Sequence, residues 1–289
     1  MLGTLFKHEM RATAKTFMWF YIAFAVIALV NILINPFAIG SFSSQAARES
    51  AQIATQSPEF LPEAIKGVLM AIYGIAIGVI AILTIVIIIL RFYRNLLGDE
   101  GYLMMTLPVT REQHIFAKLF TAVIWTICTI VLIFFSLILL FSRAGVLGQI
   151  VDGINEMIAM GVPLDRWIAL AAVILLISCF TNVLMFYAAM GIGPNLLKNR
   201  VGGSVLAYVI IYVASQLIMT FVLFGTISAI LGNPQMAPVA PGSHGFAMPQ
   251  EMIGAVDTIF LVAIIDVAAI GIVCWFITRF MLKRKLNLA

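Results

Sequence analysis

The stretch that decides the fold lies at residues 67–90 and reads GVLMAIYGIAIGVIAILTIVIIIL. It contains no charged residue. A helix needs about 20 apolar residues to cross the hydrocarbon core of a bilayer, because its backbone groups must be bonded within the segment where water is absent. Residues 67–90 are therefore predicted to form a membrane-spanning helix.

Five further segments meet the same condition, at about residues 17–40, 119–141, 167–192, 203–231 and 255–281. Of the 289 residues, 63% are hydrophobic and 10% are charged, whereas about a quarter of an ordinary soluble domain is charged. This composition excludes a soluble globular protein, a disordered chain and a disulfide-stapled secreted module. The sequence predicts an all-α polytopic membrane protein, with six transmembrane helices in a single transmembrane domain over residues 1–289.

Basic residues predict the orientation of the spans, because Lys and Arg are retained on the cytoplasmic side during insertion. With both termini inside, thirteen basic residues are cytoplasmic and four are external. The cytoplasmic residues are Lys7, Arg11, Lys15, Arg91, Arg94, Arg111, Lys118, Lys198, Arg200, Arg279, Lys283, Arg284 and Lys285, and the external ones are Arg48, Lys66, Arg143 and Arg166. The chain is thus predicted to be a multi-pass protein of the cell membrane with both termini cytoplasmic. The net charge of +4 follows from this topology and indicates no nucleic-acid partner, while the C-terminal basic cluster favours contact with anionic membrane lipids.

Residues 1–16 have the pattern of an amphipathic helix that lies in the cytoplasmic interface. Leucine, phenylalanine and methionine side chains share one face, and Lys7 and Arg11 lie on the opposite face. Glu9 projects from the apolar side, where a helix on a lipid surface would not place a carboxylate. Two interpretations stay open: this face contacts protein, or the helix end frays and lets Glu9 reach water.

Two segments are predicted on the outer side of the membrane. Apolar residues recur with helical spacing over residues 147–158, with acidic and amide side chains opposite, and this predicts a short helix on the outer surface. The stretch Gly232–Gly254 contains four prolines and no basic residue. It is expected to be an irregular external loop, ending where Pro249 opens the sixth helix.

The loop between the second and third spans, residues 98–113, is the most informative cytoplasmic segment. Gly98 and Gly101 permit backbone angles that stop the second helix, and Thr110 with Gln113 forms a capping box that starts the next one. Between them, four large apolar side chains stand in a loop that should be aqueous: Leu103, Met104, Met105 and Leu107. Apolar side chains beside fixed acids favour a docking surface for another protein, and a loop lying flat on the lipid headgroups is the alternative.

Two stretches resemble a known family. Residues 5–13, LFKHEMRAT, are similar to the connecting helix of the permease subunits of bacterial ATP-binding-cassette (ABC) exporters of the type-2 class, and residues 98–110, GDEGYLMMTLPVT, to their coupling segment. The chain looks like the small six-span permeases of Gram-positive bacteria. This resemblance implies that it forms the pathway of an exporter together with a second permease, identical or different, and with ABC ATPase subunits.

In that family the loop between spans two and three carries the coupling helix, which docks into a groove on the ATPase. The resemblance therefore implies ATPase docking by Asp99, Glu100, Gly101, Tyr102, Leu103, Met104, Met105, Thr106, Leu107 and Pro108. The external loop before span six often contains re-entrant helices in the family. The Pro-rich stretch Gly232–Gly254 looks poorly suited to them and departs from this pattern.

No Gly-x-x-x-x-Gly-Lys-Ser/Thr phosphate loop occurs in the sequence. ATP and Mg are therefore expected on the partner ATPase, with no cofactor or metal bound by this chain. The residues His8, His114 and His244 lie on different segments, and the topology places His244 on the opposite side from the other two. Without a shared metal site or paired intramembrane carboxylates, the chain is not expected to be an enzyme.

Asp266 is the only ionisable residue near the middle of a predicted span. Polar groups at this depth are costly and are the first candidates for function. The amides Asn31, Asn182 and Gln216, in spans one, four and five, could be its partners, although such residues commonly bridge helices without a further role. The pattern Gly74-x-x-x-Gly78 in span two is typical of close helix packing.

Two alternatives to an exporter remain open. A secondary transporter driven by an ion gradient would use Asp266 as its proton or cation site, and would be expected to show internal repeats and broken helices. A membrane sensor or assembly module without transport activity would use the loop at residues 98–113 to dock a regulator.

Overall fold

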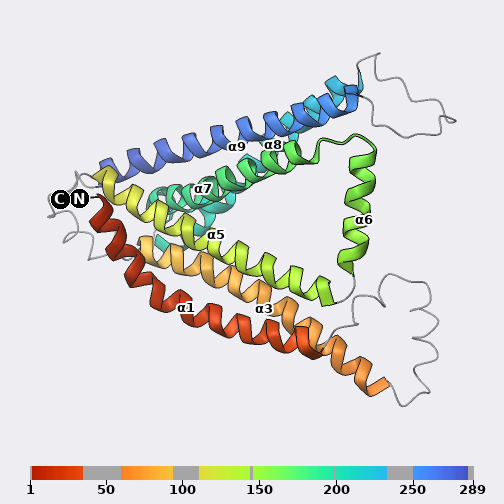
Figure 1. Cartoon of the computed structure of the whole chain (residues 1–289). Helices are drawn as coiled ribbons and strands as arrows, with labels where there is room; N and C mark the ends of the chain where they lie inside the picture. Colours follow the sequence, from red (N-terminus) through yellow and green to blue (C-terminus); the bar gives the residue numbers. More distant parts are fainter. Residues whose placement is uncertain are drawn as a thin grey trace. The chain divides into compact units, whose positions relative to one another are not determined.

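The computed structural model describes residues 2–34, 60–93, 111–143, 146–197, 200–232 and 250–285. Over these ranges the chain forms seven α-helices and no β-strand (Figure 1). The helices are α1 (Leu2–Ile34), α3 (Phe60–Phe92), α5 (Arg111–Arg143), α6 (Val146–Ala159), α7 (Leu164–Leu196), α8 (Arg200–Leu231) and α9 (Gln250–Lys285). The predicted all-α fold class is confirmed for this part of the chain.

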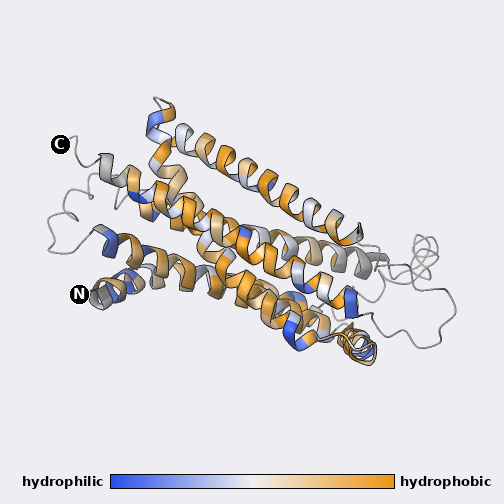
Figure 2. Cartoon of the chain, turned by 90° about the horizontal axis from the view of Figure 1, so that it is seen from above, coloured by the Kyte–Doolittle hydropathy of each residue, from blue (hydrophilic) through white to orange (hydrophobic). Residues whose placement is uncertain are grey.

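Six of the seven helices are long and apolar enough to cross a membrane, and α6 is the exception. The apolar segments are Leu5–Leu33, Gly67–Phe92, Glu112–Ser142, Leu164–Leu196, Val201–Ile230 and Gln250–Met281. Hydrophobic residues run along the long helices (Figure 2). Many large apolar side chains point outward, and Phe221, for example, is 73% exposed. Such side chains are favourable against lipid and not against water, which indicates a multi-pass membrane protein.

The helices extend beyond the spans predicted from hydropathy. α5 begins at Arg111 although its span was predicted from residue 119, and α9 begins at Gln250 and not at residue 255. A helix of 33 residues such as α5 is about 50 Å long, against a hydrocarbon core of about 30 Å. Polar residues such as Glu112 can therefore continue the helix into the headgroup region.

The first span shows the largest shift. It was predicted at residues 17–40, whereas the apolar segment of α1 is Leu5–Leu33, and residues 35–40 lie outside the described part of the chain. α1 is one continuous helix. Residues 2–16 are thus the first turns of the helix that carries the span, and not a separate helix.

The described helices belong to two compact units. The first comprises Met1–Leu90 and Phe120–Ile154, and the second comprises Arg91–Leu119 and Asn155–Ala289. α3, α5 and α6 each contribute residues to both units.

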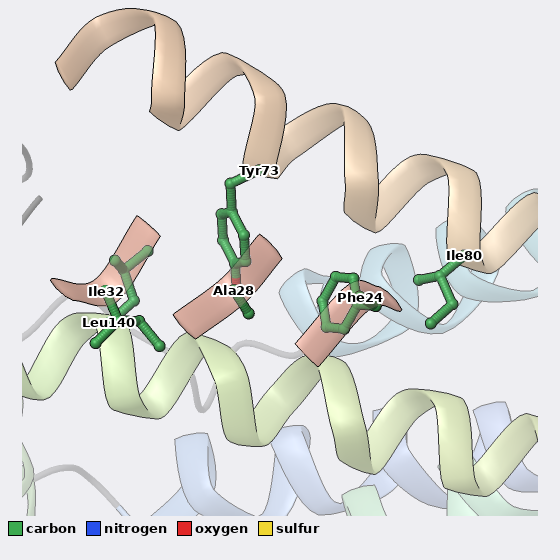
Figure 3. Close-up of a cluster of buried hydrophobic side chains, with 6 residues drawn as sticks. All are labelled: Phe24, Ala28, Ile32, Tyr73, Ile80 and Leu140. Atoms are coloured by element: carbon green, nitrogen blue, oxygen red, sulfur yellow. The ribbon is translucent and has the colours of Figure 1, made fainter. Parts of the chain in front are cut away.

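The first unit is built from α1, α3 and the larger part of α5. Six buried apolar side chains form its core (Figure 3): Phe24, Ala28 and Ile32 on α1, Tyr73 and Ile80 on α3, and Leu140 on α5. The ring centroids of Phe24 and Tyr73 lie 6.2 Å apart, and Asn31 Nδ2 donates a hydrogen bond of 2.6 Å to the carbonyl oxygen of Leu69. These two contacts advance in opposite directions along the two helices, so α1 and α3 are antiparallel.

In the second unit, α7 packs along both α8 and α9. Its contacts with α9 join residues that are 90 positions apart in the sequence: Trp167 with Asp257, Thr181 with Gly271, and Gly191 with Met281. A constant offset over this length means that α7 and α9 run parallel and side by side. Midway, Thr181 Oγ1 donates a hydrogen bond of 3.0 Å to the carbonyl oxygen of Val267.

Glycines set the close approach of α7 to α8. A Cβ atom on Gly203 would overlap the carbonyl oxygen of Gly193, and one on Gly193 would overlap Ser204. The two backbones meet here because neither glycine has a side chain. By contrast, no described atom lies within 4 Å of a Cβ placed on Gly74 or Gly78, so the packing predicted for that pair does not form within the described chain.

The short helix predicted at residues 147–158 is confirmed as α6, which follows α5 and precedes α7 in the sequence. None of its residues is buried. Of the predicted loop Gly232–Gly254, residues 233–249 lie outside the described part of the chain, and α9 begins directly after Pro249.

Candidate functional site

The ten residues expected to dock an ATPase, Asp99 to Pro108, lie outside the described residues. The structure describes the helices on either side of them, the end of α3 and the start of α5. α5 begins at Arg111, directly after Thr110 of the predicted capping box. The candidate site is therefore defined by what holds these two helix ends.

The end of α3 is attached to α7 within the second unit. The rings of Phe92 and Tyr187 are stacked, with centroids 3.8 Å apart and 17° between their planes. Both side chains are fully buried. A buried aromatic pair of this kind contributes about 0.5–1.5 kcal/mol beyond the area it removes from solvent.

The start of α5 is attached to α9 in the same unit. Glu112 Oε1 and Arg279 Nη2 form an ion pair at 2.6 Å. One turn along each helix, the rings of Phe116 and Trp275 lie 4.6 Å apart. The charged side chains are about half exposed, so the ion pair is weak and sensitive to salt, and the ring contact carries more of the attachment.

Asp266 is buried in α9, with 9% of its surface exposed, and its Oδ2 has no hydrogen-bond partner among the described residues. None of the three amides considered as partners supplies one. Asn31 belongs to the first unit and donates to Leu69, Asn182 is exposed and donates to a carbonyl of its own helix, and Gln216 is exposed. A buried carboxyl oxygen without a partner keeps the capacity to bind a proton, a cation or a polar group of a ligand.

Three residues near the start of α1 were predicted to belong to an interfacial helix. Lys7 and Arg11 are exposed, whereas Glu9 is only 6% exposed. Thr13 and Phe17, which follow Glu9 at intervals of four residues, are also buried. Glu9, Thr13 and Phe17 therefore lie on one buried side of α1 within the described chain.

A chain of hydrogen bonds that was not predicted joins α1, α3 and α5 inside the first unit. Trp125 Nε1 donates to Thr13 Oγ1 at 2.9 Å. Thr129 Oγ1 lies 2.8 Å from the hydroxyl of Tyr21 and 3.0 Å from Thr84 Oγ1. Each such bond between membrane helices contributes about 0.6 kcal/mol on average, so the chain mainly fixes the register of the three helices.

A second unpredicted contact joins the first turn of α7 to the second turn of α9. Asp257 Oδ2 lies 2.9 Å from Arg166 Nη1, and Asp257 Oδ1 accepts a hydrogen bond of 3.1 Å from Trp167 Nε1. The carboxylate side chain is 10% exposed, so both of its oxygens are held in a site largely closed to solvent. The sequence feature that could have predicted this contact was an Arg-Trp pair at the start of one predicted span and an aspartate near the start of another.

Among the described residues, no group of three His, Cys, Asp or Glu side chains is placed to bind a metal ion. The helices and their outward apolar side chains define the class of the protein, an α-helical multi-pass membrane protein. No protein-family model, curated protein or solved structure matches the chain.

Proposed function

We propose that this chain is the membrane-spanning permease subunit of an ATP-driven ABC exporter. The observation that carries this proposal is the attachment on both sides of residues 94–110. Before this segment Phe92 stacks on Tyr187 of α7, and after it Glu112 pairs with Arg279 of α9. A force applied to the segment by a docked ATPase would reach two membrane spans at once, which is what energy coupling requires.

The proposed exporter needs a second permease, because its pathway forms between two such subunits. α8 is the helix most available to it, since only 6% of its apolar segment is buried within the chain, the smallest share of the six. Its outward side chains face either lipid or this partner. Each permease would bind one ATPase subunit, and that subunit would bind ATP and Mg.

Purification from the native membrane in mild detergent tests the proposal, with mass spectrometry to identify what is bound. A cytosolic subunit with a phosphate loop is expected with the wild-type chain. The double variant Leu103→Asp/Met104→Asp is expected to lose this subunit, because two carboxylates would replace the apolar side chains of the docking surface. The matched control is Val239→Asp, which places an acid in the Pro-rich loop predicted on the opposite side of the membrane and should retain the ATPase.

Size-exclusion chromatography of each variant separates loss of docking from loss of folding. A wild-type chain that elutes as a single folded species and carries no ATPase would contradict the proposal. Equal loss of the ATPase in Val239→Asp would contradict the docking site.

The buried and unpartnered Oδ2 of Asp266 favours one second candidate, a carrier driven by an ion gradient. Under this candidate, vesicles containing the protein carry protons when a membrane potential is imposed, and Asp266→Asn abolishes this flux. Asp152→Asn, on the exposed face of α6, is the control. A flux that is absent in the wild type, or unchanged in Asp266→Asn, would exclude the candidate.

A further inference from the structure

α6 presents an apolar face of which no residue is buried within the described chain. The face consists of Leu147, Ile150, Val151, Ile154, Met157 and Ile158, and the opposite side carries Asp152, Asn155 and Glu156. At about 100° per residue, Ile154 and Glu156 lie on opposite sides of the helix axis. Val151 is 51% exposed and Ile158 is 57% exposed. A face of this kind is unfavourable in water and needs an apolar partner.

The chain holds α6 at the surface of the membrane. The spanning helix α5 ends at Arg143, the spanning helix α7 begins at Leu164, and α6 occupies most of the sequence between them. With 14 residues, α6 is about 21 Å long, too short for a hydrocarbon core of about 30 Å, and its acidic side chains oppose burial there. The end of α5 and the start of α7 therefore lie at the same surface of the membrane, and α6, which is joined to both, stays at that surface.

A defined turn sets the direction of α6 where it meets α7. Gly161, with a φ of 77°, ends the helix in the left-handed conformation that glycine adopts readily. Its N–H donates to the carbonyl of Ile158 at 2.9 Å, and the N–H of Val162 donates to that of Met157 at 3.1 Å. Val162 is buried, which anchors the turn. The turn separates α6 from α7, so the two are distinct helices and α6 is not a continuation of the span.

We propose that α6 is an interfacial helix whose apolar face enters the boundary between headgroups and acyl chains. Its partner is the lipid leaflet at this end of the spans. Free amphipathic helices that bind membranes usually carry Lys and Arg on the polar face, which recruit them to anionic lipids. α6 has two acids and no basic residue, and it needs no such recruitment because the chain ties it to a span at each end. This inference does not depend on the proposed transport function.

Site-specific labelling of the full chain in phosphatidylcholine vesicles tests the proposal. The three native cysteines, Cys128, Cys179 and Cys274, are replaced by alanine, and a fluorophore is attached to a single cysteine at position 154 or, as the matched control, at position 156. Nitroxide groups high on the acyl chains should quench the label at 154 several-fold more than the label at 156. Aqueous iodide should show the reverse order.

A photoreactive benzoylphenylalanine at 154 or 156 in a chain that keeps its cysteines gives an independent reading if the cysteine-free protein does not fold. Crosslinking to phosphatidylcholine at 154 and not at 156 would support the proposal. Iodide quenching of both labels to the same extent would overturn it by placing α6 in water. A label at 154 that neither quencher reaches, or a crosslink there to protein, would overturn it by showing that a second chain covers the face.

Discussion

Replacing Gly203 by alanine tests the close approach of α7 and α8. The added Cβ would overlap the carbonyl oxygen of Gly193, so the helices must separate or their backbones must shift. Overpacking of this kind costs about 1–3 kcal/mol. Alanine also lowers the conformational freedom of the unfolded chain, which favours the variant by about 0.5–1 kcal/mol. The expected net result is a loss of roughly 1–2 kcal/mol in the free energy of unfolding.

Gly225 in the same helix is the matched control for this change. It is exposed, and no described atom lies within 4 Å of a Cβ at this position. Alanine should therefore bring only the gain in helix stability there, so the two variants are expected to shift stability in opposite directions. Thermal unfolding in detergent, followed by circular dichroism, should show a midpoint about 2–8 °C lower for Gly203→Ala than for the wild type. A midpoint for Gly203→Ala equal to or above that of Gly225→Ala would refute the close approach.

Two further substitutions test the polar contacts of the two units by the same measurement. Thr129→Val removes a hydroxyl shared by two contacts between helices and should lower the free energy of unfolding by about 1 kcal/mol, whereas Thr126→Val, whose hydroxyl bonds only its own helix, should change it little. Equal losses in these two variants would argue against the hydrogen-bond chain. Asp257→Asn removes the charge that faces Arg166, so the free energy of unfolding should fall by about 1 kcal/mol and should depend less on added salt. Asp165→Asn, on the exposed side of α7, should leave the free energy of unfolding and its salt dependence unchanged. An unaltered salt response in Asp257→Asn would show that the ion pair does not stabilise the fold.

The long helices can be predicted from the sequence because each must meet the same condition of length and hydropathy. The helical period of residues 147–158 also suffices for α6, since a short amphipathic helix needs no partner to be recognised. The ends of the helices are harder to place. Hydropathy marks where the hydrocarbon ends and not where the helix ends, so α5 begins at Arg111 although its apolar segment was placed from residue 119.

The contacts between helices could not be predicted, because they depend on which faces meet. A threonine in an apolar helix has the same sequence signature whether it bonds its own helix, as Thr126 does, or bridges to another, as Thr129 does. Glycines are equally ambiguous, since Gly78 has the better-known motif but Gly203 makes the close approach. For Asp266 the sequence identified a costly group, and only the structure shows that its Oδ2 is unpaired among the described residues.

The constant offset between α7 and α9 also sets a delay during synthesis. A ribosome adds about 5–20 residues per second, so each α9 residue is made about 5–18 s after the α7 residue that it contacts. Phe186 of α7 contacts Tyr208 of α8, with ring centroids 4.7 Å apart in the folded protein. A much shorter stretch of chain separates these two residues, so Tyr208 is made soon after Phe186. α7 and α8 therefore have time to pair first, while the face of α7 that will receive α9 is still in contact with lipid. We therefore expect α9 to dock onto a hairpin of α7 and α8 that is already formed, and the carboxylate of Asp257 to reach Arg166 and Trp167 only at that step.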